Sequence, residues 1–152
     1  MKKWIFLALL GITIFACDKE KNEPDQDPID KQKIEQYLRD NNLNATADSS
    51  GIYYIITEPG VGGFPSPTSN VIVKYKGYLL DGTVFDQTPG NQARPFQLTT
   101  LIAGWQIGIP KLKRGGKGTF FIPSSLGYGA TGTSSVPANS VLIFEIELVD
   151  YL

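Results

Sequence analysis

The chain of 152 residues carries 14 basic and 15 acidic residues, a formal net charge of −1, and 41% of its residues are hydrophobic. This composition suits a packed domain and excludes the strongly basic surface of a nucleic-acid-binding protein. The chain has no histidine and one cysteine, which excludes catalytic triads, histidine-ligated metal sites, cysteine-cluster zinc sites and a disulfide framework.

The first residues of the chain have the pattern of an export signal. Two lysines precede an apolar run that is shorter than the ~20 residues of a membrane-spanning helix. The run ends in Ile14-Phe15-Ala16-Cys17, which resembles the lipobox of bacterial lipoproteins. The resemblance implies a lipoprotein signal peptide over residues 1–16 and lipidation of Cys17. It also implies export and lipid anchoring to the cell envelope, on the periplasmic or surface side of the outer membrane.

Residues 17–30 are mostly charged or polar and cannot bury enough apolar surface to offset chain entropy, so we interpret them as a lipidated, disordered tether. The alternative, in which Cys17 is a buried residue of a core helix, is disfavoured because nothing in this stretch can anchor a core before Ile29.

A short amphipathic helix is predicted over residues 31–45, with Asp30 as its cap. Such a helix either packs on the domain or spaces it from the tether, and we favour the spacer. The apolar stripe that predicts it consists of Ile34, Tyr37, Leu38 and Leu43.

From Gly51 onwards apolar and polar residues alternate, which is typical of strands. A hairpin turn is predicted at Asp81-Gly82. In the last strand Glu145 and Glu147 alternate with apolar residues, which indicates a sheet with one buried and one solvated face. The predicted strands cover residues 52–57, 71–80, 83–85, 117–122 and 141–149.

Residues 100–107 predict a second short helix, capped by Thr99 or Thr100 and stopped by Gly108 and Pro110. The apolar face of the sheet must pack against this helix, which places Trp105 between helix and sheet.

Four segments of the chain then resemble, in order and spacing, the blocks of FKBP-type peptidyl-prolyl cis-trans isomerases. The resemblance extends over residues 51–152, which we interpret as the isomerase domain. It implies an α+β fold, an antiparallel half-barrel sheet wrapped around one short helix, here preceded by signal peptide, tether and N-terminal helix. The segments are VIVKYKGYLLDGTVFDQT (71–88), IAGWQIGIPKLKRGGKGTFFIP (102–123), LGYGATG (126–132) and VPANSVLIFEIELV (136–149).

The resemblance also implies a set of site residues. Trp105 corresponds to the floor of the pocket, and the N–H of Ile102 and the hydroxyl of Tyr128 correspond to the donors that receive substrate carbonyls. The pocket residues are Tyr75, Phe85, Asp86, Phe96, Ile102, Trp105, Tyr128 and Phe144, with Leu101 and Val136 as an aliphatic wall that binds substrate.

Two positions differ from the family pattern. An arginine usual near the pocket carboxylate has no aligned counterpart, although Arg94 is a candidate to replace it. Thr133 stands in a shortened loop where an aromatic residue or histidine is common. Both differences concern peptide preference and efficiency.

The implied activity is rotation of X-Pro peptide bonds during the folding of exported proteins. The implied partners are proline-containing segments of client proteins, the membrane through the lipid anchor, and macrolides of the kind this family binds. Rotation forms no new bond, so it needs no nucleophile, metal or cofactor. Two alternatives remain open: a peptide-binding module or holdase with little turnover, and a structural surface lipoprotein.

Overall fold

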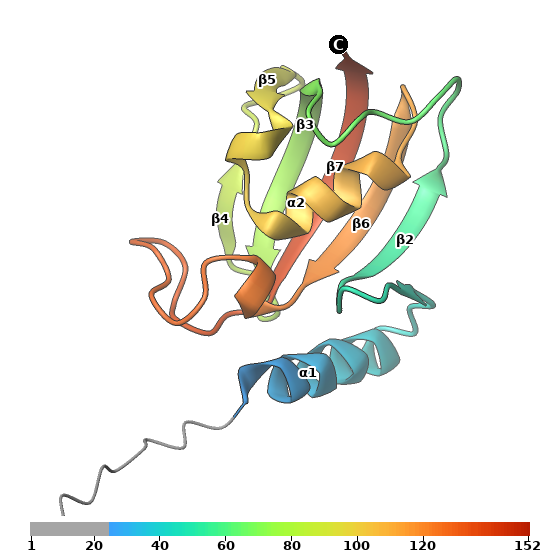
Figure 1. Cartoon of the computed structure of the whole chain (residues 1–152). Coiled ribbons are helices and arrows are strands. Elements are labelled where there is room, and N and C mark those ends of the chain that lie inside the picture. The colour runs from blue at the N-terminus through green and yellow to red at the C-terminus, as the bar shows by residue number, and fades with distance from the viewer. Residues whose placement is uncertain (1–24) are drawn as a thin grey trace, which may run out of the picture.

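The computed structural model describes residues 25–152, which form a twisted antiparallel sheet with one helix packed on each face. In Figure 1 one of these helices lies in front of the sheet and the N-terminal helix lies below its end. The strands pair in the order β1-β2-β6-β7-β3-β4, and β5 pairs with the opposite end of β3 from β4. In this part of the chain no helix combines the length and the hydropathy that crossing a membrane requires. The predicted signal peptide, the lipidation of Cys17 and the tether before Asp25 lie outside the described residues.

The helices and strands, in chain order, are α1 (Gln26–Asp40), β1 (Thr46–Ala47), β2 (Tyr53–Glu58), β3 (Asn70–Leu79), β4 (Val84–Gln87), β5 (Arg94–Gln97), α2 (Ala103–Gly108), β6 (Gly116–Ile122) and β7 (Leu142–Tyr151). Three short 3-10 helices lie between them: η1 (Leu98–Thr100), η2 (Ile109–Lys111) and η3 (Ser124–Leu126).

The strands form where alternation predicted them. On β3, Val71, Val73 and Tyr75 are buried, as the period-two pattern requires. The predicted turn at Asp81-Gly82 connects β3 and β4, and Gly82 adopts a φ of 88°, which few residues other than glycine tolerate. The predicted α+β architecture is confirmed.

Helix α2 packs on one face of the sheet (Figure 1). Trp105 lies between the two and is 5% exposed, as predicted. The close approach requires glycine, because a Cβ on Gly108 would lie 2.9 Å from Phe120 Cδ1. The predicted threonine cap is wrong. Thr99 and Thr100 belong to η1, and the residue that caps α2 is Ile102, whose side chain makes no capping hydrogen bond.

Helix α1 corrects two of the predictions. It begins at Gln26, not Lys31, and Asp25 caps it by accepting a hydrogen bond from Asp27 N at 3.3 Å. Asp30, the predicted cap, lies inside the helix and is completely buried. Pro28 stands in the first turn of this helix, where proline is tolerated because that N–H has no partner within the helix.

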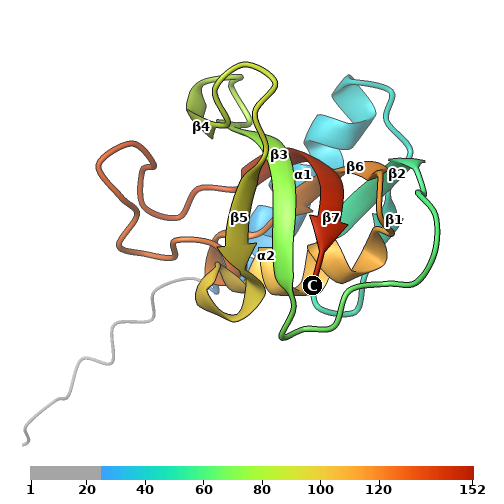
Figure 2. The same cartoon turned by 90° about the horizontal axis from the view of Figure 1, so that it is seen from above.

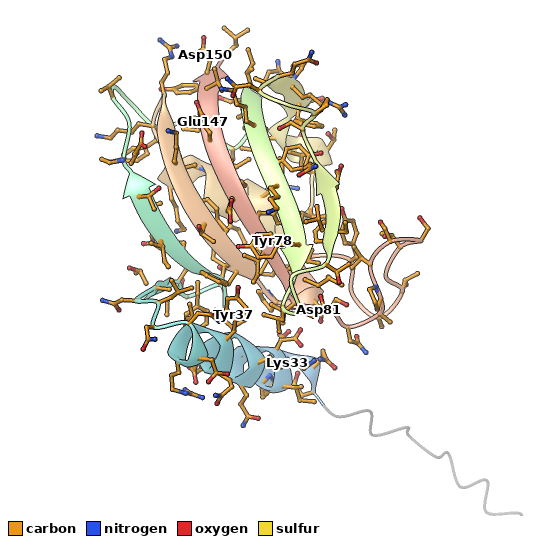
Figure 3. All side chains as sticks on the ribbon, turned by 180° about the vertical axis from the view of Figure 1, so that it is seen from behind. Lys33, Tyr37, Tyr78, Asp81, Glu147 and Asp150 are labelled. Carbon is orange, nitrogen blue, oxygen red and sulfur yellow. The ribbon has the colours of Figure 1, made fainter. Side chains whose placement is uncertain are left out.

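The helix is also not a spacer, because it packs on the face of the sheet opposite α2. Ile34 and Leu38 contact a second core that includes Phe121 and Ile143, whereas Leu43 is 40% exposed. Seen from behind, α1 crosses one end of the sheet, and Tyr37 lies at the junction (Figure 3). The face that the sequence predicted to be solvated is therefore exposed only at the end of the sheet that α1 does not cover.

Candidate active site

A pocket of about 220 Å³ opens between α2 and the sheet. All eight residues that line it belong to the ten that the sequence singled out. They are Tyr75, Asp86, Phe96, Leu101, Ile102, Trp105, Tyr128 and Phe144.

The remaining two predicted residues do not line the pocket. Phe85 is half-buried and packs against Phe144, with ring centroids 5.4 Å apart and planes at 86°. Val136 is 2% exposed and belongs to the core. Both therefore support the pocket from outside. A Cβ on Gly77 would lie 2.7 Å from the ring of Phe85 and 2.7 Å from that of Phe144, so this glycine makes room for the two aromatic rings.

Three larger hollows, of about 480 to 640 Å³, lie elsewhere on the described residues. Polar side chains predominate around them, and some are already paired, such as Lys74 with Glu147 at 3.6 Å on the back of the sheet (Figure 3). The smaller pocket is the one enclosed by aromatic rings, which makes it the candidate for an apolar ligand.

Trp105 lines this pocket and is held by aromatic rings from three strands. Its ring centroid lies 5.0 Å from that of Tyr75, 5.2 Å from Phe144 and 6.0 Å from Phe96, with interplanar angles between 81° and 86°. These are edge-to-face contacts, which stabilise the cluster beyond the burial of its area. Among the described residues, Trp105 Nε1 finds no hydrogen-bond partner although it is buried.

The Tyr75 hydroxyl donates to Asp86 Oδ2 at 2.6 Å. Burial raises the pKa of Tyr75 well above its ordinary value, and the Asp86 carboxylate raises it further. The backbone of Tyr75 is fixed as well, because its N–H donates to Thr88 Oγ1 at 3.2 Å and its carbonyl accepts from Thr88 N at 3.0 Å. Thr88 is a supporting residue that the sequence reasoning missed, because a single threonine after a short strand carries no signal.

Two donors stand at the rim of the pocket. Within residues 25–152 neither the N–H of Ile102 nor the hydroxyl of Tyr128 donates a hydrogen bond. The Ile102 carbonyl accepts from Trp105 N at 2.9 Å, which aligns the start of α2 and leaves the Ile102 N–H outside the helix. Tyr128 is 37% exposed, and burial of its ring, followed by the charge of Asp86, raises its pKa.

Neither of the two positions that differ from the family pattern lines the pocket. Arg94 is exposed on β5 and, within the described chain, forms no ion pair with Asp86. Its charge opposes the rise in the pKa of Tyr75, which burial dominates. Thr133 Oγ1 accepts from Val136 N at 3.0 Å and so shapes its own loop without lining the pocket. This loop, between β6 and β7, projects on the side of β4 and β5 (Figure 2).

The arrangement suits one kind of ligand. An apolar ring fits between Trp105 and the surrounding aromatic side chains, and carbonyl groups on either side of that ring can accept from Ile102 and Tyr128. Asp86 also lines the pocket, and its Oδ2 accepts the hydrogen bond from the Tyr75 hydroxyl.

Comparison with known proteins gives a consistent result. The family model for FKBP-type peptidyl-prolyl cis-trans isomerases matches residues 62–149. The chain is 35% identical over 132 residues to the FKBP-type peptidyl-prolyl cis-trans isomerase FkpA of Escherichia coli (strain K12), covering 86% of this chain and 48% of that protein. FkpA of Aeromonas hydrophila is 39% identical over 133 residues, covering 85% and 50%. The chain thus spans about half the length of these curated relatives.

Two crystal structures show the same fold. That of FkpA from Escherichia coli has a TM-score of 0.73 at 34% identity, covering 79% of this chain and 57% of the relative. That of a peptidyl-prolyl cis-trans isomerase from Pseudomonas syringae pv. tomato has a TM-score of 0.70 at 29% identity, covering 82% and 94%.

Proposed function

The chain belongs to the FKBP-type peptidyl-prolyl cis-trans isomerases, and on this basis we propose that it accelerates rotation of X-Pro peptide bonds during the folding of exported proteins. The observation that carries the proposal is the aromatic pocket over Trp105 with two free donors at its rim. Proline-containing segments of client proteins are the proposed substrates, and macrolides of the kind this family binds are further proposed ligands of the same pocket.

The chemistry needs a barrier of ~18–20 kcal/mol to be lowered, because rotation breaks the resonance of the amide. Without a catalyst the rotation takes tens to hundreds of seconds. The planar amide is more charge-separated than the twisted transition state. A pocket whose walls are aromatic and exclude water therefore favours the twisted form relative to the planar form.

The two donors supply orientation. With the prolyl ring on Trp105, the Ile102 N–H and the Tyr128 hydroxyl each donate to a carbonyl of the peptide and hold it in a turn. Asp86 acts one step away, because its hydrogen bond fixes the Tyr75 ring that forms part of the wall. No proton is transferred and no covalent intermediate forms.

We further propose that the protein is exported and anchored by lipid at Cys17. The support is the lysine-flanked apolar run that ends in Ile14-Phe15-Ala16-Cys17. The membrane is then a partner through the anchor, with the isomerase domain held at the periplasmic or surface side of the outer membrane.

A protease-coupled assay on X-Pro peptides tests the activity. Tyr128→Phe removes one donor and should lower kcat/KM roughly two- to tenfold, which corresponds to the loss of one hydrogen bond of about 0.5–1.5 kcal/mol. Asp86→Ala should also lower it, because the Tyr75 ring loses its anchor. Tyr151→Phe is the matched control, since Tyr151 lies at the end of β7 and does not line the pocket.

Three outcomes separate the alternatives. Turnover that depends on Tyr128 and Asp86 supports the isomerase. Saturable peptide binding without turnover in the wild type indicates a binding module or holdase. The absence of both turnover and binding indicates a structural lipoprotein and refutes the proposal.

A further inference from the structure

Asp30 of α1 is the one acidic residue of the described chain that is completely buried. Four donors surround its carboxylate. Oδ2 accepts from Ser124 N at 2.8 Å and from Ser124 Oγ at 2.5 Å, and Oδ1 accepts from Gln26 Nε2 at 2.7 Å and from Lys33 Nζ at 3.4 Å. A carboxylate is costly to bury unless all its acceptors are used, and here both oxygens are.

Ser124 connects this buried carboxylate to the turn that carries Tyr128. The carbonyl of Ser124 accepts from Gly127 N at 3.0 Å and from Gly129 N at 2.8 Å. These two glycines flank Tyr128, one of the two rim donors. Gly129 has a φ of 58°, a conformation that side chains rarely adopt, so the turn that presents Tyr128 is specific. Ser124 is thus held from α1 on one side and holds the Tyr128 turn on the other.

Docking of the helix does not by itself require this carboxylate. Ile34 and Leu38 already bury the apolar stripe of α1 against the sheet, and an apolar residue at position 30 would add to that contact at lower desolvation cost. What a carboxylate adds is direction, because two of its hydrogen bonds fix both the backbone and the side chain of Ser124.

We propose that Asp30 is a positioning residue of the isomerase site, which acts through Ser124 on the hydroxyl of Tyr128. The inference rests on the proposed function, and it means that α1 contributes to the geometry of the active site. The family match begins at residue 62, so this contribution comes from a segment outside the matched region. The substrate peptide does not touch Asp30.

Activity provides the first test, with the full chain and X-Pro peptides. Asp30→Ala leaves both Ser124 donors without a partner and should lower kcat/KM about tenfold, through a lower kcat as well as a higher KM. Asp30→Asn keeps one oxygen that accepts from both donors and should stay within about threefold of the wild type. Asp27→Ala removes the same charge from an exposed position of the same helix and should have no effect.

A double-mutant cycle distinguishes positioning from general support. If Asp30 acts through the Tyr128 hydroxyl, Asp30→Ala should cost less than about threefold in a Tyr128→Phe background, where that hydroxyl is already absent. An equal tenfold loss in both backgrounds overturns the proposal, as does an Asp30→Ala variant as active as Asp27→Ala.

Hydrogen exchange tests the same contact without any activity. The amides of Gly127 and Gly129 should exchange about tenfold faster in Asp30→Ala, while the amides of β6 and β7 keep their protection. Unchanged exchange at both glycines refutes the proposal. If the wild type turns over no proline peptide, the proposed function fails, yet this measurement still decides whether Asp30 fixes the loop. Should Asp30→Ala not fold, Ser124→Ala serves in its place, because it keeps the N–H bond to Asp30 and removes the hydroxyl bond.

Discussion

Truncation of Phe144 should reveal how much of the stability of the fold resides in the aromatic wall of the pocket. The side chain is 3% exposed and its ring packs against Trp105 at 5.2 Å, Phe85 at 5.4 Å and Tyr75 at 6.3 Å. Phe144→Ala removes these contacts and leaves a cavity that the surrounding strands cannot close. The expected cost is about 3–5 kcal/mol of the free energy of unfolding.

Phe64→Ala is the matched control. Phe64 is 58% exposed, and its recorded aromatic contact is with Lys113 Nζ, 5.2 Å from the ring centroid. Its truncation should therefore cost no more than about 1 kcal/mol. Urea denaturation measures both free energies, and thermal unfolding should show a decrease of roughly 10–20 °C for Phe144→Ala. If both variants lose the same small amount of unfolding free energy, Phe144 does not pack against these three rings and does not form part of the pocket wall.

Three further outcomes are expected. Burial raises the pKa of Tyr53 to about 12 and raises that of Tyr75 as well. Tyrosines of the unfolded state ionise near pH 10. Above pH 10 the unfolded state therefore binds fewer protons than the folded state. The free energy of unfolding should therefore fall between about pH 10 and pH 12, and a flat profile in urea denaturation would contradict the burial. In a Trp4→Phe variant, the emission of Trp105 should be blue-shifted and should change saturably with a proline peptide; emission like that of an exposed indole would show that Trp105 does not form the floor. Cys17→Ser should abolish lipid labelling and release the protein from the membrane fraction, and retention there would refute the anchor.

Much of this fold is readable from the sequence because its strands are regular. Alternation over β3 and β7 predicted which residues are buried, and the helix-length run before Gly108 predicted α2. Two strands were missed for physical reasons. β1 has two residues, too few for a period, and β5 contains Pro95, which weakens any strand prediction although proline is accepted at a sheet edge.

The site, like the fold, was predicted from the sequence only in part. Its aromatic residues were found through a resemblance, because a buried aromatic residue taken alone looks the same in a core and in a pocket. The link between Asp30 and Ser124 was missed, since the partners are 94 residues apart and neither belongs to a motif. The lack of apolar residues before Ile29 also assigned the start of α1 to the tether, so Asp30 was predicted as a cap and not as a buried residue of the helix.

The most direct test of the account is exchange NMR on an X-Pro peptide at catalytic amounts of protein, with no protease present. Without a catalyst, cis and trans forms interconvert over tens to hundreds of seconds, too slowly to give exchange cross-peaks. The wild type should produce such cross-peaks, Tyr128→Phe should weaken them and Tyr151→Phe should leave them unchanged. Interconversion at the uncatalysed rate in the presence of the wild type would contradict the claim that this pocket catalyses prolyl rotation.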